Sequence, residues 1–163
     1  MTSLLHPRVE AVIVEAGIAV RELACDPDFA DTAAFMEKYG FTSEQSANTI
    51  LVASKKVEPA KYAVCVVLAS TKLDVNKKVR ELLGVRKASF ADGDTTVQLT
   101  DMQIGGVTAI GIADLPIYVD SAVMEQPEVV MGGGNRTSKV VIAPSELLKL
   151  PNVEVVKELA KLV

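Results

Sequence analysis

Six glycines between residues 105 and 134 have the type and spacing that could serve chemistry. They are Gly105, Gly106, Gly111, Gly132, Gly133 and Gly134. Glycine among apolar, strand-like runs marks backbone that takes a positive φ or approaches another group closely. N–H groups exposed in such bends can hold a carboxylate or phosphate, or stabilise an oxyanion. The alternative is that these glycines form only hairpin turns and bulges.

The glycine pattern matches neither of two familiar nucleotide-binding motifs. No Gly-Lys-Ser or Gly-Lys-Thr follows it, and no strand, Gly-x-Gly-x-x-Gly and helix occur in that order. The two cysteines, Cys25 and Cys65, lack metal-ligand spacing, and His6 is the single histidine. We therefore expect neither a metal site nor a cofactor.

The net charge of −4 on 163 residues argues against a protein that coats nucleic-acid phosphates. One segment is different: residues 72–87 hold six cations against Asp74 and Glu81, a local charge of +4 (six minus two). The alternative for this segment is a solvated helix face. No signal peptide pattern or membrane-spanning apolar stretch is visible, so we expect a cytoplasmic protein.

The elements that must position these residues follow from periodicity and caps. Helices are predicted over 8–16, ending at Gly17, and from Asp31 to Gly40. Thr42 to Gln45 forms a capping box. Further helices are predicted over 75–83, after Asp94, after Pro144 and from Asn152 to the end. The last has an apolar stripe, which consists of Val156, Leu159, Ala160 and Val163.

Strands are predicted at 18–23, 48–52, 62–69, 87–91, 107–112, 116–119, 128–131 and 138–142. The run from Tyr62 to Ala69 is apolar almost throughout, as in a central strand buried on both faces. Strict alternation of strands and helices is absent. We therefore expect one domain over 1–163 of the α/β (α+β) class, with a mixed sheet curled into a partial barrel and surrounded by helices.

Several segments together carry a resemblance to a known family. They are His6-Pro7, residues 31–34, 42–51, Leu82-Leu83-Gly84 with 87–91, 105–111, Val119-Asp120 and 132–134. In order and spacing they resemble the YbaK/EbsC family, the aminoacyl-tRNA editing domain associated with prolyl-tRNA synthetase. The resemblance implies a YbaK-like partial barrel and a cavity for the aminoacyl group on the 3′ end of tRNA. It also implies ester hydrolysis without a metal, an aminoacyl-tRNA partner, possible contact with a synthetase, and a monomer or homodimer.

The resemblance also implies site residues. It assigns catalysis to position 48 and to Thr49, and substrate binding to the glycine-rich bends. The binding residues are Gly105, Gly106, Val107, Thr108, Ala109, Gly111, Gly132 and Gly133. Two departures stand out: Asn48 replaces the lysine of editing relatives, and Ala109 replaces the proline that ends their glycine loop.

A different lysine could replace the one missing at position 48. Lys55 and Lys56 lie about 26 Å along an extended strand, which is too far. Lys61 begins the paired strand near the same turn. Lys87 is the better candidate for substrate binding, and the alternative is that it is an exposed lysine at a strand end.

Three functions remain open on the sequence. The chain is a free-standing deacylase of mischarged tRNA, or a binding module that kept the pocket and lost the chemistry because of Asn48. The third possibility is an interaction protein with an apolar oligomer interface.

Overall fold

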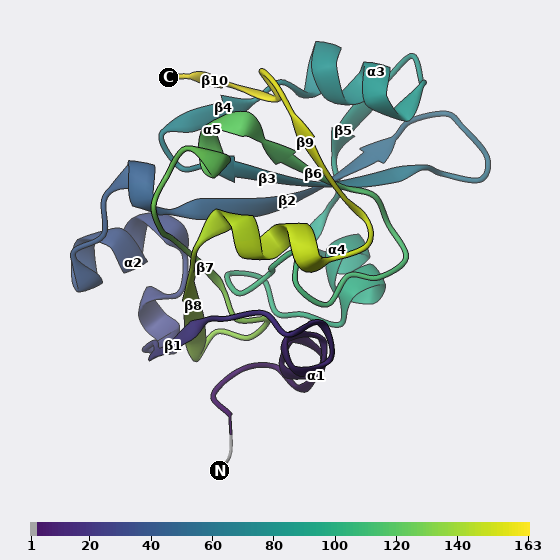
Figure 1. Cartoon of the computed structure of the whole chain (residues 1–163). Coiled ribbons are helices and arrows are strands. Elements are labelled where there is room, and N and C mark those ends of the chain that lie inside the picture. Colours follow the sequence, from purple (N-terminus) through teal and green to yellow (C-terminus); the bar gives the residue numbers. More distant parts are fainter. Residues whose placement is uncertain (1–2) are drawn as a thin grey trace.

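The computed structural model describes residues 3–163 and contains three sheets (Figure 1). The largest has five strands in the order β5-β2-β3-β6-β9. Their bounds are β5 (Ala88–Phe90), β2 (Ala47–Ser54), β3 (Tyr62–Leu68), β6 (Ile117–Asp120) and β9 (Val153–Val156). β2 runs antiparallel to β3 and β5, whereas β3, β6 and β9 are parallel. The α+β class with a mixed sheet is therefore confirmed.

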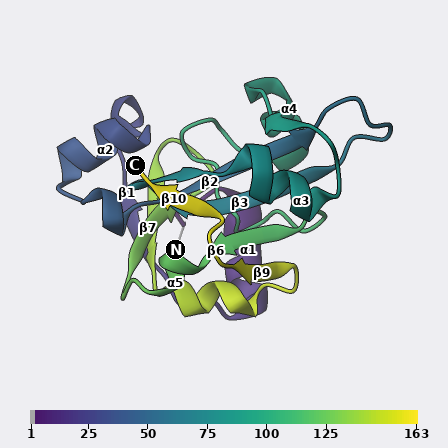
Figure 2. The ribbon, with the colours of Figure 1, turned by 90° about the horizontal axis from the view of Figure 1, so that it is seen from above.

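Two smaller sheets flank the large one. β1 (Arg21–Ala24), β8 (Ser138–Ile142) and β7 (Val129–Gly132) form the antiparallel order β1-β8-β7. β4 (Thr71–Leu73) pairs antiparallel with β10 (Ala160–Leu162). Figure 1 shows the three-stranded sheet below the five-stranded one. Figure 2, seen from above, shows β10 and α3 in front of the five-stranded sheet.

The helices are short. The α-helices are α1 (Pro7–Ala16), α2 (Thr32–Tyr39), α3 (Arg80–Leu83), α4 (Gly93–Thr100) and α5 (Ser121–Met124). A π-helical turn, η3 (Val75–Val79), leads into α3, and three 3₁₀ turns are η1 (Pro27–Phe29), η2 (Ser43–Gln45) and η4 (Pro144–Lys149). Among residues 3–163 no helix is both long and apolar enough to cross a membrane.

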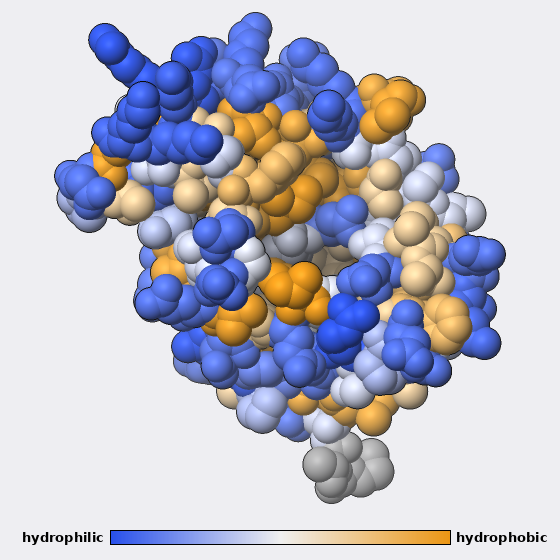
Figure 3. Space-filling model, turned by 180° about the vertical axis from the view of Figure 1, so that it is seen from behind, coloured by the Kyte–Doolittle hydropathy of each residue, from blue (hydrophilic) through white to orange (hydrophobic). Residues whose placement is uncertain are grey.

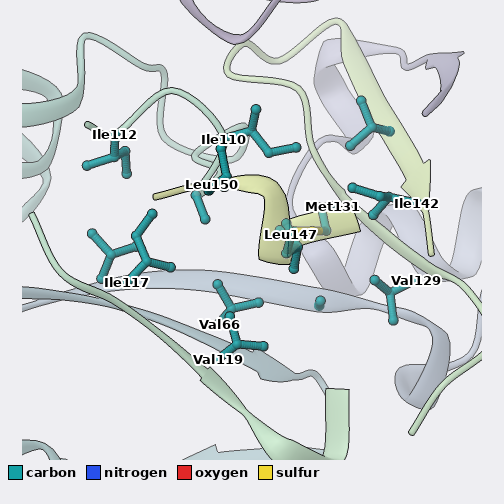
Figure 4. Packing of buried hydrophobic residues seen from close by; sticks show 14 of the residues in the cluster. Val66, Ile110, Ile112, Ile117, Val119, Val129, Met131, Ile142, Leu147 and Leu150 are labelled. Atoms are coloured by element: carbon teal, nitrogen blue, oxygen red, sulfur yellow. The ribbon is translucent and has the colours of Figure 1, made fainter. Parts of the chain in front are cut away.

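β3 separates two hydrophobic clusters because its side chains alternate between the faces of the sheet. Val64 and Val66 pack with Met131, Ile142 and residues of η4 between the two larger sheets (Figure 4). Cys65 and the other odd-numbered residues pack on the opposite face, beneath η3 and α3. The near-continuous burial of β3 confirms the predicted central strand.

Several boundaries predicted from local patterns are confirmed. Gly17, Gly40 and Gly84 end helices with positive φ, and the capping box of Thr42 and Gln45 is present. The first strand begins at Arg21 rather than at Ile18, and Asp92 rather than Asp94 caps α4.

Two predicted elements are wrong. Residues 107–112 form turns instead of a strand, because positive φ at Gly105 and Gly111 breaks the extended path. Residues 152–163 form β9 and β10 instead of a helix. The apolar stripe there was a coincidence of spacing: Leu159 is buried but Val163 is 95% exposed. The β-branched run of β9 favours a strand.

Candidate active site

A cavity of about 470 Å³ opens where the five-stranded and three-stranded sheets separate. One wall is β2, and the opposite wall combines β7 with Lys139 of β8. The rim is completed by α2, Phe90, Ile104, Gly105 and Val107. The face drawn in Figure 3 is hollowed near its centre, with hydrophobic residues beside the hollow. The cavity lining is mainly apolar with a few polar groups, as in small-molecule sites.

The backbone of β2 presents alternate residues to this cavity. At the ends of the β2–β3 pair, the Ser46 carbonyl accepts from Ala69 N–H and Ser54 N–H donates to the Lys61 carbonyl, both at 2.8 Å. Even-numbered residues therefore turn their backbone polar groups toward β3. Odd-numbered residues, Thr49 among them, turn theirs toward the opposite edge.

That opposite edge is covered at both ends and open in the middle. Ala53 pairs with Ser89 of β5, and the Leu51 carbonyl accepts from Ala91 N–H at 2.9 Å. Beyond the other end, Ser46 meets β7 in an isolated bridge. The backbone N–H and C=O of Thr49 point to this edge between its two covered ends, and Thr49 lines the cavity there.

The side chains at positions 48 and 49 add polar groups. Asn48 Oδ1 accepts a hydrogen bond from Thr32 Oγ1 at 2.6 Å, which holds the amide against the start of α2. Thr49 Oγ1 is buried and has no hydrogen-bond partner among the described residues. A buried hydroxyl without a partner is costly, so Thr49 is a natural contact for a polar ligand atom.

Lys139 places a buried ammonium at the opposite wall. The residue is 6% exposed, and its Nζ donates to the carbonyls of Ala30 at 2.7 Å and Gly105 at 2.9 Å. The Nζ also lies 5.2 Å from the ring centroid of Phe35. An ammonium has three donors, so one remains after these two bonds. Burial lowers the pKa of Lys139 from its ordinary value, an effect that the nearby Cys25 and Asp31 partly oppose.

Arg136 ties the rim of the cavity together. Its guanidinium bonds Asp31 Oδ1 at 3.0 Å, the Ile104 carbonyl at 2.8 Å and the Pro27 carbonyl at 2.7 Å. These contacts join the start of α2 to the loop that carries Gly105. Because Asp31 is already paired with Arg136, the ammonium of Lys139 is the charge of the cavity without a carboxylate partner within 4 Å among residues 3–163.

The glycine bends use two of their amides internally. Gly106 N–H donates to the Gln103 carbonyl at 2.9 Å, and Gly134 N–H donates to the Gly106 carbonyl at 2.6 Å. A Cβ on Gly132 would lie 2.5 Å from the Gly106 carbonyl oxygen. The backbones of the two bends therefore pack directly against each other. The Gly105 carbonyl points to Lys139.

The structure brings together five of the predicted site residues in the cavity lining. They are Asn48, Thr49, Gly105, Val107 and Gly132. The remaining predicted residues lie outside the lining. They are Gly106, Thr108, Ala109, Gly111, Gly133 and Lys87.

The reasons differ among the residues outside the lining. Thr108 and Ala109 are buried, and Gly111 packs beside Met102 and Arg8. Lys87 is exposed beyond the far end of β2, where its carbonyl accepts from Lys55 N–H at 2.9 Å.

Sequence reasoning missed Lys139. Alternation along β8 places Lys139 and Val141 on one face, and a single lysine there suggests a solvent-exposed face. Only the tertiary arrangement shows that α2 covers this face and that the lysine points to Ala30 and Gly105. The one local signal was a charged residue inside a run of β-branched residues.

The arrangement can bind a small group through both polar and apolar contacts. Lys139, Thr49 and Asn48 supply side-chain donors, the backbone of Thr49 points to the same edge, and the rest of the lining is mainly apolar. Donors that converge in a partly dry cavity can stabilise the negative charge that develops on an ester carbonyl oxygen during hydrolysis.

Comparison with known proteins gives the fold and the family of this chain. A solved structure of the hypothetical protein APE2540 superposes with a TM-score of 0.82 at 21% identity, covering 94% of this chain and 99% of that one. A proposed trans-editing enzyme for prolyl-tRNA synthetase superposes with a TM-score of 0.78 at 23% identity, covering 94% and 97%. These likenesses show the fold. The model of the aminoacyl-tRNA editing domain matches residues 26–150, which is more than half of the sequence. The chain therefore belongs to the aminoacyl-tRNA editing domain family.

Proposed function

We propose that this chain is a free-standing deacylase that hydrolyses the ester of a mischarged aminoacyl-tRNA in the cytoplasm. The observation that carries the proposal is the buried ammonium of Lys139 in a cavity that also contains Asn48 and Thr49. The lysine that editing relatives carry at position 48 is absent, and Lys139 supplies a cation from the facing strand instead.

The proposed roles follow from the donors. The remaining N–H of Lys139 stabilises the oxyanion that forms when water attacks the ester carbonyl, and Thr49 Oγ1 donates to the same oxygen or to the ribose. The Thr49 carbonyl at the open edge of β2 accepts from the substrate ammonium. Such an ester is already activated, so positioning supplies much of the rate.

The first test is release of amino acid from a panel of mischarged tRNAs. We expect turnover of at least one of these tRNAs. Absence of turnover with every tRNA, at enzyme concentrations comparable to substrate, would exclude the hydrolase.

Variants of the cavity test the assignment of the cation. Lys139→Met should lower kcat by about 100- to 1000-fold, as expected for loss of one charged oxyanion donor. Because Lys139 also bonds the Ala30 and Gly105 carbonyls, circular dichroism must show a folded variant. Thr49→Val keeps the side-chain shape, removes the hydroxyl, and should lower kcat about tenfold. Full activity of both folded variants would refute the catalytic roles of Lys139 and Thr49.

The second candidate is a binding module of the same fold. The neutral Asn48 favours it, because two of the three Lys139 protons are already bonded to protein carbonyls. This candidate predicts that an aminoacyl-nucleoside binds without being cleaved. It also predicts that Asn48→Lys creates cleavage where the native chain shows none.

A further inference from the structure

We propose that a second hollow beside the cavity holds the single-stranded 3′ end of the RNA, with a base on Phe90 and phosphates near Lys72 and Lys161. This inference rests on the proposed function, because it assumes that the aminoacyl group lies in the first cavity. It assigns a ligand to a region distinct from the residues that surround the ester.

The second hollow measures about 490 Å³ and lies between β4, β5, β10 and the start of η3. Phe90 lines both hollows and is the one described residue that their linings share. Phe90 is 58% exposed, although it ends a strand of the central sheet. An exposed aromatic ring at the mouth of a cavity is a stacking platform for a base, and stacking of this kind tolerates any base.

The charges along this hollow suit a phosphate backbone. Lys72 is exposed, and none of the six cations between residues 72 and 87 forms an ion pair with a carboxylate among residues 3–163. Lys161 adds a further cation whose side chain is 71% exposed, with Asp74 Oδ2 at 3.8 Å. Asp74 also caps η3 by accepting from Lys77 N–H, so its charge is partly satisfied by the protein.

The direction of the strand follows from the acidic residues. Asp92 and Asp94 begin α4 just after Phe90, and their exposed carboxylates would repel phosphates on that side. On the other side of Phe90, Lys72 and Lys161 carry positive charge. The RNA backbone therefore leaves the cavity past Phe90 toward β4 and β10, where Lys72 and Lys161 line the second hollow.

The first experiment measures binding of a short single-stranded RNA with the tRNA 3′-terminal sequence, by fluorescence anisotropy at several salt concentrations. Phe90→Leu keeps an apolar side chain and should weaken binding about 5- to 100-fold through loss of stacking. Lys72→Gln and Lys161→Gln should each reduce the slope of log affinity against log salt by about 0.7. Lys38→Gln is the matched control, since Lys38 carries the same charge on α2 and lines neither hollow.

The second experiment compares two substrates with the same variants. The ratio of kcat/KM on an aminoacylated RNA to kcat/KM on 3′-aminoacyl-adenosine should fall about tenfold in Lys72→Gln and stay constant in Lys38→Gln. The adenosine ester lacks the preceding nucleotides, so it reports on the cavity alone.

The outcomes separate the two proposals. Native affinity in all three variants of the second hollow, an unchanged substrate ratio, or no RNA binding by the native chain at millimolar concentration would overturn the RNA site, whether or not the protein is a deacylase. Loss of RNA binding in the variants of a chain that hydrolyses nothing would support the RNA site and reject the hydrolase.

Discussion

Lys139 and Asn48 face the same cavity from different strands. The sequence shows an asparagine where editing relatives carry a lysine, which suggests a missing charge. The structure places another ammonium in the cavity, from a residue 91 positions further along the chain (139 minus 48). Neighbours in sequence could not reveal it, because the partners of its Nζ are backbone carbonyls of Ala30 and Gly105.

The lowered pKa of Lys139 predicts the alkaline limb of the pH–rate profile. The ammonium is present below the pKa in the folded protein and is lost as pH rises through it, which happens earlier than for an exposed lysine. After subtraction of spontaneous hydrolysis, kcat should therefore decline below the ordinary lysine range near 10.4. A rate that stays constant up to that range would show that the charge of Lys139 is not used.

The same shift has a consequence for stability. A lysine with a lowered pKa in the folded state binds fewer protons than it does in the unfolded chain, so the free energy of unfolding should rise with pH between the two pKa values. Urea titrations at several pH values measure the free energy of unfolding of the native protein and of Lys139→Met. As pH rises between the two pKa values, the native protein should gain stability relative to the variant.

At the scale of elements, local signals in the sequence predict the caps, the turns and the central strand. They fail where tertiary contacts determine whether a segment forms a helix, a strand or a turn. Gly17 and Gly40 end helices through their own backbone freedom, so their role was visible in the sequence. The predictions for residues 107–112 and 152–163 are wrong because the apolar spacing in these segments suits more than one kind of element. Parallel pairing of β9 with β6, a contact distant in sequence, selects the strand.

The close approach of the two glycine bends can be tested by adding one methyl group. Gly132→Ala places a Cβ 2.5 Å from the Gly106 carbonyl oxygen and 2.7 Å from that of Val107, both rigid backbone atoms. We expect a loss of about 1–3 kcal/mol of stability together with reduced activity, because the loop must shift. Gly93→Ala is the control: its nearest neighbour is the flexible Ile104 side chain at 3.8 Å. Equal thermal stability of the two variants would argue against this packing.

At the scale of the whole molecule, Asp120 links the central sheet to the C-terminal strands. The residue is 2% exposed at the end of β6, and its Oδ1 accepts from the buried Leu159 N–H at 3.2 Å. Burial raises the pKa of this carboxyl from its ordinary value, although hydrogen bonds from several backbone amides oppose the shift. The contact holds the chain that leads into β10, and thereby the wall of the second hollow.

Removal of this acceptor should loosen the C-terminal strands. Asp120→Ala leaves the Leu159 N–H buried without a partner, and we expect it to lower the free energy of unfolding by about 1–3 kcal/mol in urea titrations. Asp120→Asn keeps an oxygen for that N–H and should lose less. If both variants lose the same free energy, the charge rather than the acceptor supports the fold.

Cys65 lies at the middle of β3, so the reactivity of its thiol reports opening of the five-stranded sheet. Its side chain is fully buried, and burial raises its pKa to about 12. In a Cys25→Ala background, a thiol-reactive dye at pH 8 should therefore modify the protein only as fast as the central sheet comes apart. Rapid labelling without denaturant would mean that the five-stranded sheet opens locally while the rest of the protein stays folded. Slow labelling that accelerates in urea would measure the rate of global unfolding.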